Sequence, residues 1–163
     1  MNRLYPVGIQ NFEKIRKNGY IYVDKTALLY QLVKTGQYYF LSRPRRFGKS
    51  LTISTLEAYF TGKRELFKGL DMEQLEKDWT VHPVLHMDLN TEKYDTEESL
   101  EHKLELTLKQ WEEEYGSNPD EYSVATRFEG VIRRAALKTG CNVVILIDEY
   151  DKPILQTISK PEL

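Results

Sequence analysis

An uninterrupted apolar run near the C-terminal end of the sequence, residues 143–147, limits the fold more than any other segment. The run is rich in β-branched residues, which favour strands, and apolar and polar residues do not alternate within it. Strands of this kind are buried on both faces and belong mainly to parallel sheets covered by helices. Two acidic residues, Asp148 and Glu149, follow directly. The sequence therefore predicts a buried parallel strand that places two carboxylates at one edge of a sheet.

The order of elements along the chain indicates the fold class. Shorter apolar runs at 38–41 and 83–89 predict two more strands. Between the strands, apolar residues recur every three or four positions, which is the spacing of a helix with one buried face. Helices are expected over about residues 26–35, 49–60, 65–70, 71–78, 100–115 and 125–138. Strands that alternate with helices imply a parallel sheet with helical crossovers, which is an α/β fold.

Length and composition narrow the class of protein. The chain has 163 residues, near the size of one domain, and its 40% hydrophobic and 29% charged residues are typical of a soluble globular protein. A formal net charge of -2 gives no general attraction to nucleic acid. No apolar stretch has the length of a membrane span or the form of a secretory signal. Because Cys141 is the single cysteine, no disulfide can form within the chain, and we expect a cytoplasmic protein.

The loop between the first predicted strand and the helix at 49–60 contains Gly48, Lys49 and Ser50. A phosphate-binding loop needs this order, because backbone N–H groups and a helix N-terminus then converge on the anion. Gly48 would allow close approach of the backbone, Lys49 would reach the β- and γ-phosphates, and Ser50 would contact Mg²⁺. The usual pattern has an earlier glycine, at the position where Arg43 stands. The alternative for this motif is a solvated turn whose arginines are surface charges.

The acidic pair Asp148 and Glu149 is a second motif, which complements the phosphate-binding loop. A buried strand that ends in a carboxylate is the Walker B form, in which the carboxylate lies at the magnesium site. Asp148 would hold the ion, mostly through water, and Glu149 would act as general base on the attacking water. Alone, the pair also suits an ordinary polar turn. Because both motifs follow apolar strands in the right order, with helical crossovers between them, together they predict a site for Mg-ATP.

Several strings of residues resemble the bacterial AAA-ATPase-like proteins. The similarity is carried by 22–26 (YVDKT), 41–51 (LSRPRRFGKSL) and 147–151 (IDEYD), and also by 56–60 and 83–88. It spans nearly the whole chain, and the string RPRRFGKS is highly specific. The resemblance explains the absent first glycine as a family trait. It implies a P-loop NTPase-type parallel sheet, with nucleotide contacts from Arg45, Arg46, Phe47, Gly48, Lys49, Ser50 and Leu51.

The resemblance also supports roles beyond the phosphate loop. Lys49 and Glu149 are expected to be catalytic, and Ser50 and Asp148 to hold the magnesium ion. The segment 22–29 is expected to lie beside the adenine base. Relatives commonly carry a C-terminal domain similar to PD-(D/E)XK nucleases, so such a domain, or another protein, is an expected partner. No membrane partner is expected, and nucleic acid is supported only weakly, by the arginine loop.

The extent of the chain indicates an incomplete domain. In the AAA-like arrangement that the resemblance implies, the strand order is 5-1-4-3-2, and this sequence supplies only the first three strands. We therefore expect residues 1–163 to be the N-terminal portion of a single AAA-ATPase-like domain, truncated after the Walker B motif. A strand-wide gap, or non-native pairing, is expected between 38–41 and 143–147. The isolated chain should expose apolar surface and turn over ATP weakly or not at all.

Two hypotheses for function follow from these motifs. The first is an enzyme that hydrolyses Mg-ATP in the full-length protein and couples hydrolysis to a conformational change. The alternative is a nucleotide-dependent binding module or switch with little turnover, which could serve an appended nuclease-like domain. Glu149 favours the enzyme, because a switch does not need a general base.

Overall fold

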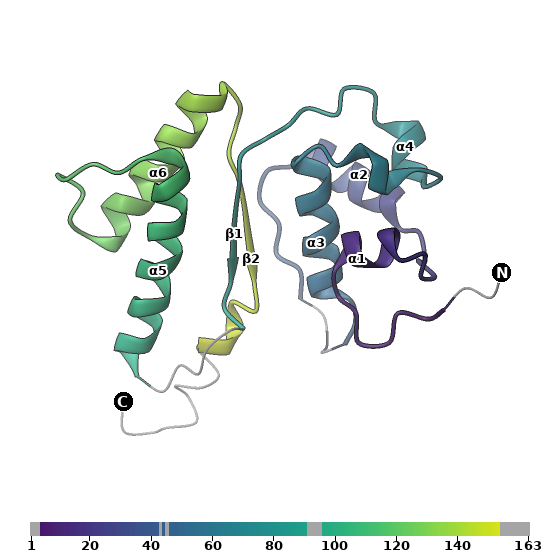
Figure 1. Cartoon of the computed structure of the whole chain (residues 1–163), viewed down its shortest axis with the longest axis horizontal. Helices are drawn as coiled ribbons and strands as arrows, with labels where there is room; N and C mark the ends of the chain where they lie inside the picture. Colours follow the sequence, from purple (N-terminus) through teal and green to yellow (C-terminus); the bar gives the residue numbers. More distant parts are fainter. Residues whose placement is uncertain (1–3, 43, 45, 91–95, 154–163) are drawn as a thin grey trace. The chain divides into compact units, whose positions relative to one another are not determined.

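The structure is a computed structural model that describes residues 4–42, 44, 46–90 and 96–153. Its residues fall into two compact units, Met1–Val81 and His82–Leu163 (Figure 1). The described part of the first unit is helical, and the second unit holds a parallel pair of strands with two helices. Within the described segments, no helix is long and apolar enough to cross a membrane. The fold is therefore mixed α/β, as the sequence predicts.

Helices build the first unit, and most of them begin and end near the predicted positions. They are α1 (Phe12–Lys17), α2 (Thr26–Thr35), α3 (Lys49–Phe60), the 3-10 helix η1 (Arg64–Phe67) and α4 (Asp71–Leu75). The helix α1 is missing from the sequence prediction, because its 6 residues are too few to show a helical period. The side chain of Asn11 caps it by accepting a hydrogen bond from the backbone N–H of Lys14 at 2.8 Å.

Aromatic rings fill the core of the first unit. Phe12 and Phe67 are both 0% exposed, and their ring centroids lie 5.0 Å apart. Trp79 packs on Phe67 at 5.2 Å, and Tyr59 of α3 lies 6.4 Å from the same ring. Tilted and edge-on ring pairs of this kind stabilise beyond the burial of their apolar area. One aromatic cluster therefore joins α1, α3 and η1.

Asp24 connects the N-termini of two helices. Its Oδ1 accepts hydrogen bonds from the backbone N–H and the hydroxyl of Thr26, at 2.8 and 2.7 Å. Its Oδ2 accepts one from the backbone N–H of Asp71 at 2.8 Å. Burial alone would raise the pKa of Asp24, but these hydrogen bonds outweigh it and lower the pKa. The 22–26 string thus has a structural role in joining α2 to α4, apart from the nucleotide contact expected of it.

Glu76 is a buried carboxylate, 3% exposed, at the end of α4. It accepts a hydrogen bond from the Tyr59 hydroxyl and another, at 2.9 Å, from the backbone N–H of Asp78. Its Oε2 also pairs with the Lys34 ammonium at 2.9 Å. Burial alone would raise the pKa of Glu76, but these hydrogen bonds outweigh burial and lower the pKa to about 2. The charged form of Glu76 therefore stabilises the first unit.

We expect the first unit to lose stability in acid through Glu76. Because the folded pKa is about 2 and the ordinary value is 4.5, the contribution is complete above about pH 4.5 and is lost as the pH falls toward 2. Its size is at most about 3 kcal/mol. Urea unfolding between pH 2 and 7 measures it. Glu76→Gln should flatten the acid limb, whereas Glu65→Gln, a change at an exposed glutamate of η1, should keep it. An unchanged acid limb in Glu76→Gln would contradict this role.

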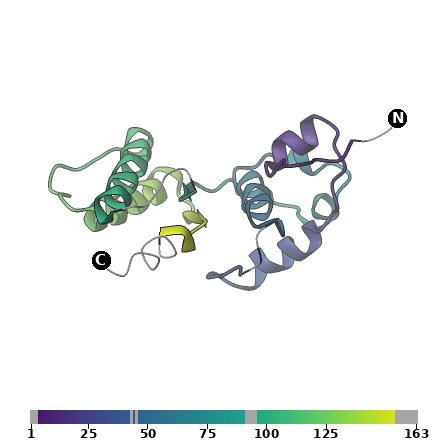
Figure 2. The same cartoon turned by 90° about the horizontal axis from the view of Figure 1, so that it is seen from below.

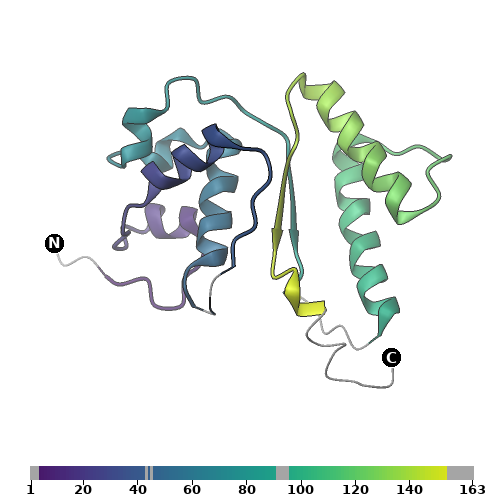
Figure 3. The same cartoon turned by 180° about the vertical axis from the view of Figure 1, so that it is seen from behind.

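The second unit holds β1 (Val84–Asp88), α5 (Glu97–Tyr115), α6 (Val124–Thr139) and β2 (Val144–Asp148). The strands pair in parallel, and Asp88 is in register with Asp148 at their carboxyl ends. Both helices are capped by a hydroxyl side chain, Thr96 before α5 and Ser123 before α6. Figures 2 and 3 show α5 and α6 lying side by side along the strand pair. The core between them includes Leu85, Met87, Leu108, Trp111 and Val131.

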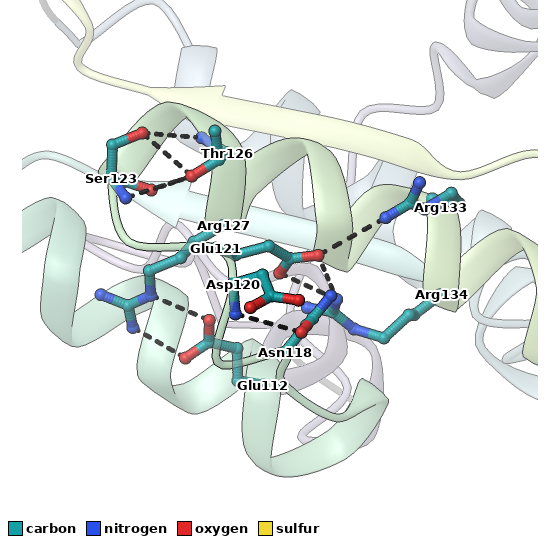
Figure 4. Close-up of polar contacts among 9 residues, drawn as sticks. All are labelled: Glu112, Asn118, Asp120, Glu121, Ser123, Thr126, Arg127, Arg133 and Arg134. Atoms are coloured by element: carbon teal, nitrogen blue, oxygen red, sulfur yellow. Dashed lines mark hydrogen bonds and ion pairs between the residues drawn. The ribbon is translucent and has the colours of Figure 1, made fainter.

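Ion pairs hold the helices and the connection between them in place (Figure 4). Arg127 of α6 binds Glu112 of α5 through two hydrogen bonds, at 2.9 and 2.7 Å. Arg134 donates to both carboxylate oxygens of Glu121, at 2.7 and 2.8 Å. Gly130 makes room for Glu121, because a Cβ at this position would lie 2.0 Å from the carboxylate. These contacts fix the crossover that connects β1 to β2.

Two predictions about strands are wrong. Residues 38–41 form no strand, and Tyr38 and Phe40 are 93% and 70% exposed. A strand needs a neighbour for its backbone hydrogen bonds, and the described part of the first unit contains none. The run 143–147 is not buried on both faces, because Ile145 and Ile147 are 40% and 45% exposed. Among the described residues β2 pairs only with β1, so its other edge has no neighbouring strand. The gap expected between 38–41 and 143–147 stays a prediction.

Candidate functional site

The loop before α3 has an unusual backbone. Arg46 and Gly48 have positive φ angles of 68° and 78°, in the left-handed region. Gly48 adopts this conformation without strain, whereas a side chain at Arg46 does so at a cost. The backbone N–H of Phe47 donates to the carbonyl of Pro44 at 3.3 Å, which closes the turn. Residues that alternate between right- and left-handed conformations can form a concave set of N–H groups that binds anions.

Gly48 also ends the loop at the first turn of α3. It is the N-cap residue and offers no side-chain acceptor to the N–H groups of that turn. A Cβ built on it would meet no protein atom within 4 Å, so the space beside it is open. The helix itself is anchored, because the Ser54 hydroxyl accepts a hydrogen bond from the backbone N–H of Phe12 at 2.9 Å. An anchored helix therefore begins beside open space, and a helix N-terminus favours an anion.

The structure places most of the predicted contact residues in this one region. Lys49 and Ser50 are the first two residues of α3 and are half-buried. Arg46 is exposed, and Phe47 is 65% exposed. Leu51 differs from the others, because its side chain packs against the core of the first unit and leaves only its backbone for an anion. Arg45, the remaining predicted contact residue, lies outside the described residues, as does Arg43, which stands where the usual pattern has its first glycine.

The second group of predicted residues follows β2. Asp148 is 8% exposed, and its Oδ1 accepts a hydrogen bond from the backbone N–H of Glu149 at 3.0 Å. Glu149 has a φ of 55°, also in the left-handed region. On the neighbouring strand, the Oδ1 of Asp88 accepts from the backbone N–H of Asn90 at 2.8 Å, which caps the strand end. The carboxyl edge of the sheet thus carries Asp148 and Glu149 on a strained turn.

The oxygen donors here suit a hard cation such as Mg²⁺. Asp151, in the turn after Glu149, has a buried Oδ1 with no hydrogen-bond partner among the described residues. In the same part of the chain, no group of three or more His, Cys, Asp or Glu side chains is placed to hold a metal alone. Mg²⁺ in nucleotide sites is typically held by one or two protein oxygens together with the phosphates and water. Ser50 and Asp148 are the oxygen donors that the sequence analysis predicts for this role.

The structure brings the predicted residues together in two groups. One group, at the start of α3 in the first unit, consists of Gly48, Lys49 and Ser50. The other, at the end of β2 in the second unit, consists of Asp148 and Glu149. The sequence analysis did not find the contact between Lys152 and Asn90, because these residues lie 62 positions apart and neither belongs to a motif.

Comparison with known proteins places this mixed α/β chain among the predicted ATPases. The sequence profile of the family described as "Predicted AAA-ATPase" matches residues 6–163, and the chain belongs to this family. A relative from Azotobacter chroococcum mcd 1, described as "Uncharacterized protein in vnfD 5'region", is 43% identical over 160 residues. The match covers 97% of this chain but 31% of the relative. No solved structure matches the chain significantly.

Proposed function

We propose that this chain binds Mg-ATP and hydrolyses it within the full-length protein, where hydrolysis drives a conformational change. The observation that supports this most is the loop before α3. Left-handed backbone at Arg46 and Gly48, a helix start without a side-chain cap, and open space beside Gly48 suit a bound phosphate chain. The membership of the chain in a predicted ATPase family agrees with this proposal.

Within this proposal, Lys49 and Ser50 act on the phosphates. Lys49 is the first residue of α3, so its positive charge would add to the partial positive charge of the helix N-terminus. The Ser50 hydroxyl is one position further along the helix and would serve as a ligand for Mg²⁺. When bound, Mg²⁺ neutralises charge that develops on the β- and γ-phosphates. The exposed Phe47 and Arg46 would border the nucleotide.

The carboxylates after β2 would act on the other reacting groups. Asp148 is buried, and the backbone N–H of Glu149 holds one of its oxygens in place. An oriented carboxylate of this kind suits the cation or its water ligands. The Glu149 side chain follows at a backbone position with a φ of 55°, and strained positions of this kind are common where a catalytic group must be aimed. Glu149 would accept the proton of the attacking water.

We expect Lys49→Ala to weaken Mg-ATP binding by about tenfold to a hundredfold, because it removes one charged hydrogen-bond donor to the phosphates. Titration with a fluorescent ATP analogue measures the dissociation constant. Lys14→Ala is the matched control, since Lys14 is an exposed lysine on α1 of the same unit. Circular dichroism should show that both variants are folded. Equal affinity in Lys49→Ala, Lys14→Ala and the unmodified chain would contradict the proposed site.

A further inference from the structure

The turn that follows β2 is held at its backbone. The carbonyl of Glu149 accepts a hydrogen bond from the backbone N–H of Lys152 at 3.0 Å, and the N–H of Glu149 donates to Asp148. Both backbone groups of Glu149 therefore have a fixed partner. This matters because its φ of 55° is unfavourable for a residue with a Cβ, so the turn needs contacts that keep it in this form.

The side chain of Lys152 extends this restraint to the neighbouring strand. Its ammonium donates to the backbone carbonyl of Asn90 at 2.6 Å and to the Oδ1 of Asn90 at 3.3 Å. Asn90 is itself fixed, because its backbone N–H donates to the Asp88 carboxylate. Between these contacts the strand ladder continues, since the N–H of Leu89 donates to the carbonyl of Asp148 at 3.1 Å. The ends of β1 and β2 are thus linked by backbone and side chain together.

We propose that Lys152 is a positioning residue that keeps Glu149 in its left-handed conformation by clamping the turn 149–152 to Asn90. This inference rests on the proposed function for its catalytic consequence. The clamp joins the segment after β1 to the turn after β2, so both ends of the strand pair move together. Lys152 reaches Asn90 with a charged donor, which makes the hydrogen bond stronger than one between neutral groups. Loss of the clamp frees the turn, and the Glu149 carboxylate is then aimed at its water for less of the time.

Two variants of Lys152 test the clamp in the 163-residue chain. Lys152→Met removes the ammonium but keeps a long side chain, and Lys152→Arg keeps a charged donor. The matched control is Lys109→Met, a change at an exposed lysine of α5 in the same unit. Amide exchange measured by NMR should become at least about tenfold faster at Glu149 and Lys152 in Lys152→Met alone, because local exchange reports local opening. Unchanged exchange at both amides would overturn the proposal.

The same variants separate positioning from simple stabilisation through their kinetics. In the full-length protein with saturating Mg-ATP, Lys152→Met should lower kcat by about tenfold and leave KM and nucleotide affinity unchanged, because Glu149 acts on the chemical step. Lys152→Arg should recover most of kcat. A rise in KM with kcat unchanged would overturn the proposal, since it would place Lys152 in nucleotide binding. The exchange measurement needs no turnover, so it tests the clamp even if Lys49→Ala binds Mg-ATP normally and the proposed ATPase function fails.

Discussion

In the Glu149→Gln variant we expect ATP turnover to fall by about a hundredfold to ten-thousandfold, the usual contribution of a general base. Glutamine has nearly the same shape as glutamate but cannot accept a proton from water. The backbone N–H of Glu149 donates to the Asp148 carboxylate, and this hydrogen bond does not involve the Glu149 side chain. The turn should therefore survive the change. The affinity for Mg-ATP should therefore stay within about threefold of the original value, because Lys49 and the loop before α3 are untouched.

Turnover and affinity must be measured together for this variant. Phosphate release gives the rate, and titration with a fluorescent ATP analogue gives the dissociation constant. Glu113→Gln is the matched control, since Glu113 is an exposed glutamate of α5 in the same unit and lies outside both motifs. Turnover that is the same in Glu149→Gln and Glu113→Gln would remove Glu149 as the base. If the unmodified full-length protein binds Mg-ATP tightly but shows negligible turnover, the nucleotide-dependent switch is favoured.

Phe67→Ala is expected to destabilise the first unit by about 3–5 kcal/mol, the range found when a buried phenylalanine is truncated. Phe67 is 0% exposed, and its ring packs against the rings of Phe12, Tyr59 and Trp79. Its removal leaves a cavity that these large rings cannot easily fill. Domains have a total stability of only about 5–15 kcal/mol, so this single change should remove a large part of the stability of the first unit.

Hydrogen exchange followed by mass spectrometry can assign this loss to one unit. Peptides from Met1–Val81 should lose protection in Phe67→Ala, and the loss should be far larger than in peptides from His82–Leu163. Tyr38→Ala is a suitable control, because Tyr38 is an aromatic residue of the same unit that is 93% exposed, and its loss should change stability by less than about 0.5 kcal/mol. A loss in Tyr38→Ala as large as in Phe67→Ala would contradict this assignment, because it would show that an exposed ring supports the unit as much as the aromatic core does.

Much of the secondary structure follows from local sequence. The helix α3 begins at Lys49 and ends at Phe60, as its pattern predicts, because Gly48 and Thr61-Gly62 mark its ends within a few residues. The strands β1 and β2 were predicted from apolar runs, and the long helices between them from their apolar period. The residues of the proposed phosphate loop and of the acidic pair were predicted in the same way, because each motif is a short string of neighbouring residues.

Contacts between distant residues explain what the sequence analysis missed. The string 22–26 was interpreted through nucleotide binding, yet Asp24 joins α2 to Asp71, 47 positions away. The clamp between Lys152 and Asn90 has no sequence signal, because neither residue is unusual on its own. Residues 38–41 have the composition of a strand but form none in the described part of the chain, since a strand exists only when another backbone pairs with it.

By itself, the sequence determined the mixed α/β class of the fold, most of the helices and the two strands that form, and it predicted the residues of both halves of the proposed nucleotide site. It could do so because helix periodicity, apolar strands and short motifs depend on neighbours in the chain. Only the tertiary structure decided which apolar run becomes a strand, which carboxylates serve as helix or strand caps, and how the turn carrying Glu149 is held. Those outcomes depend on backbone and side-chain groups that folding brings together from far apart in the sequence, where hydrogen-bond partners are chosen by position and burial.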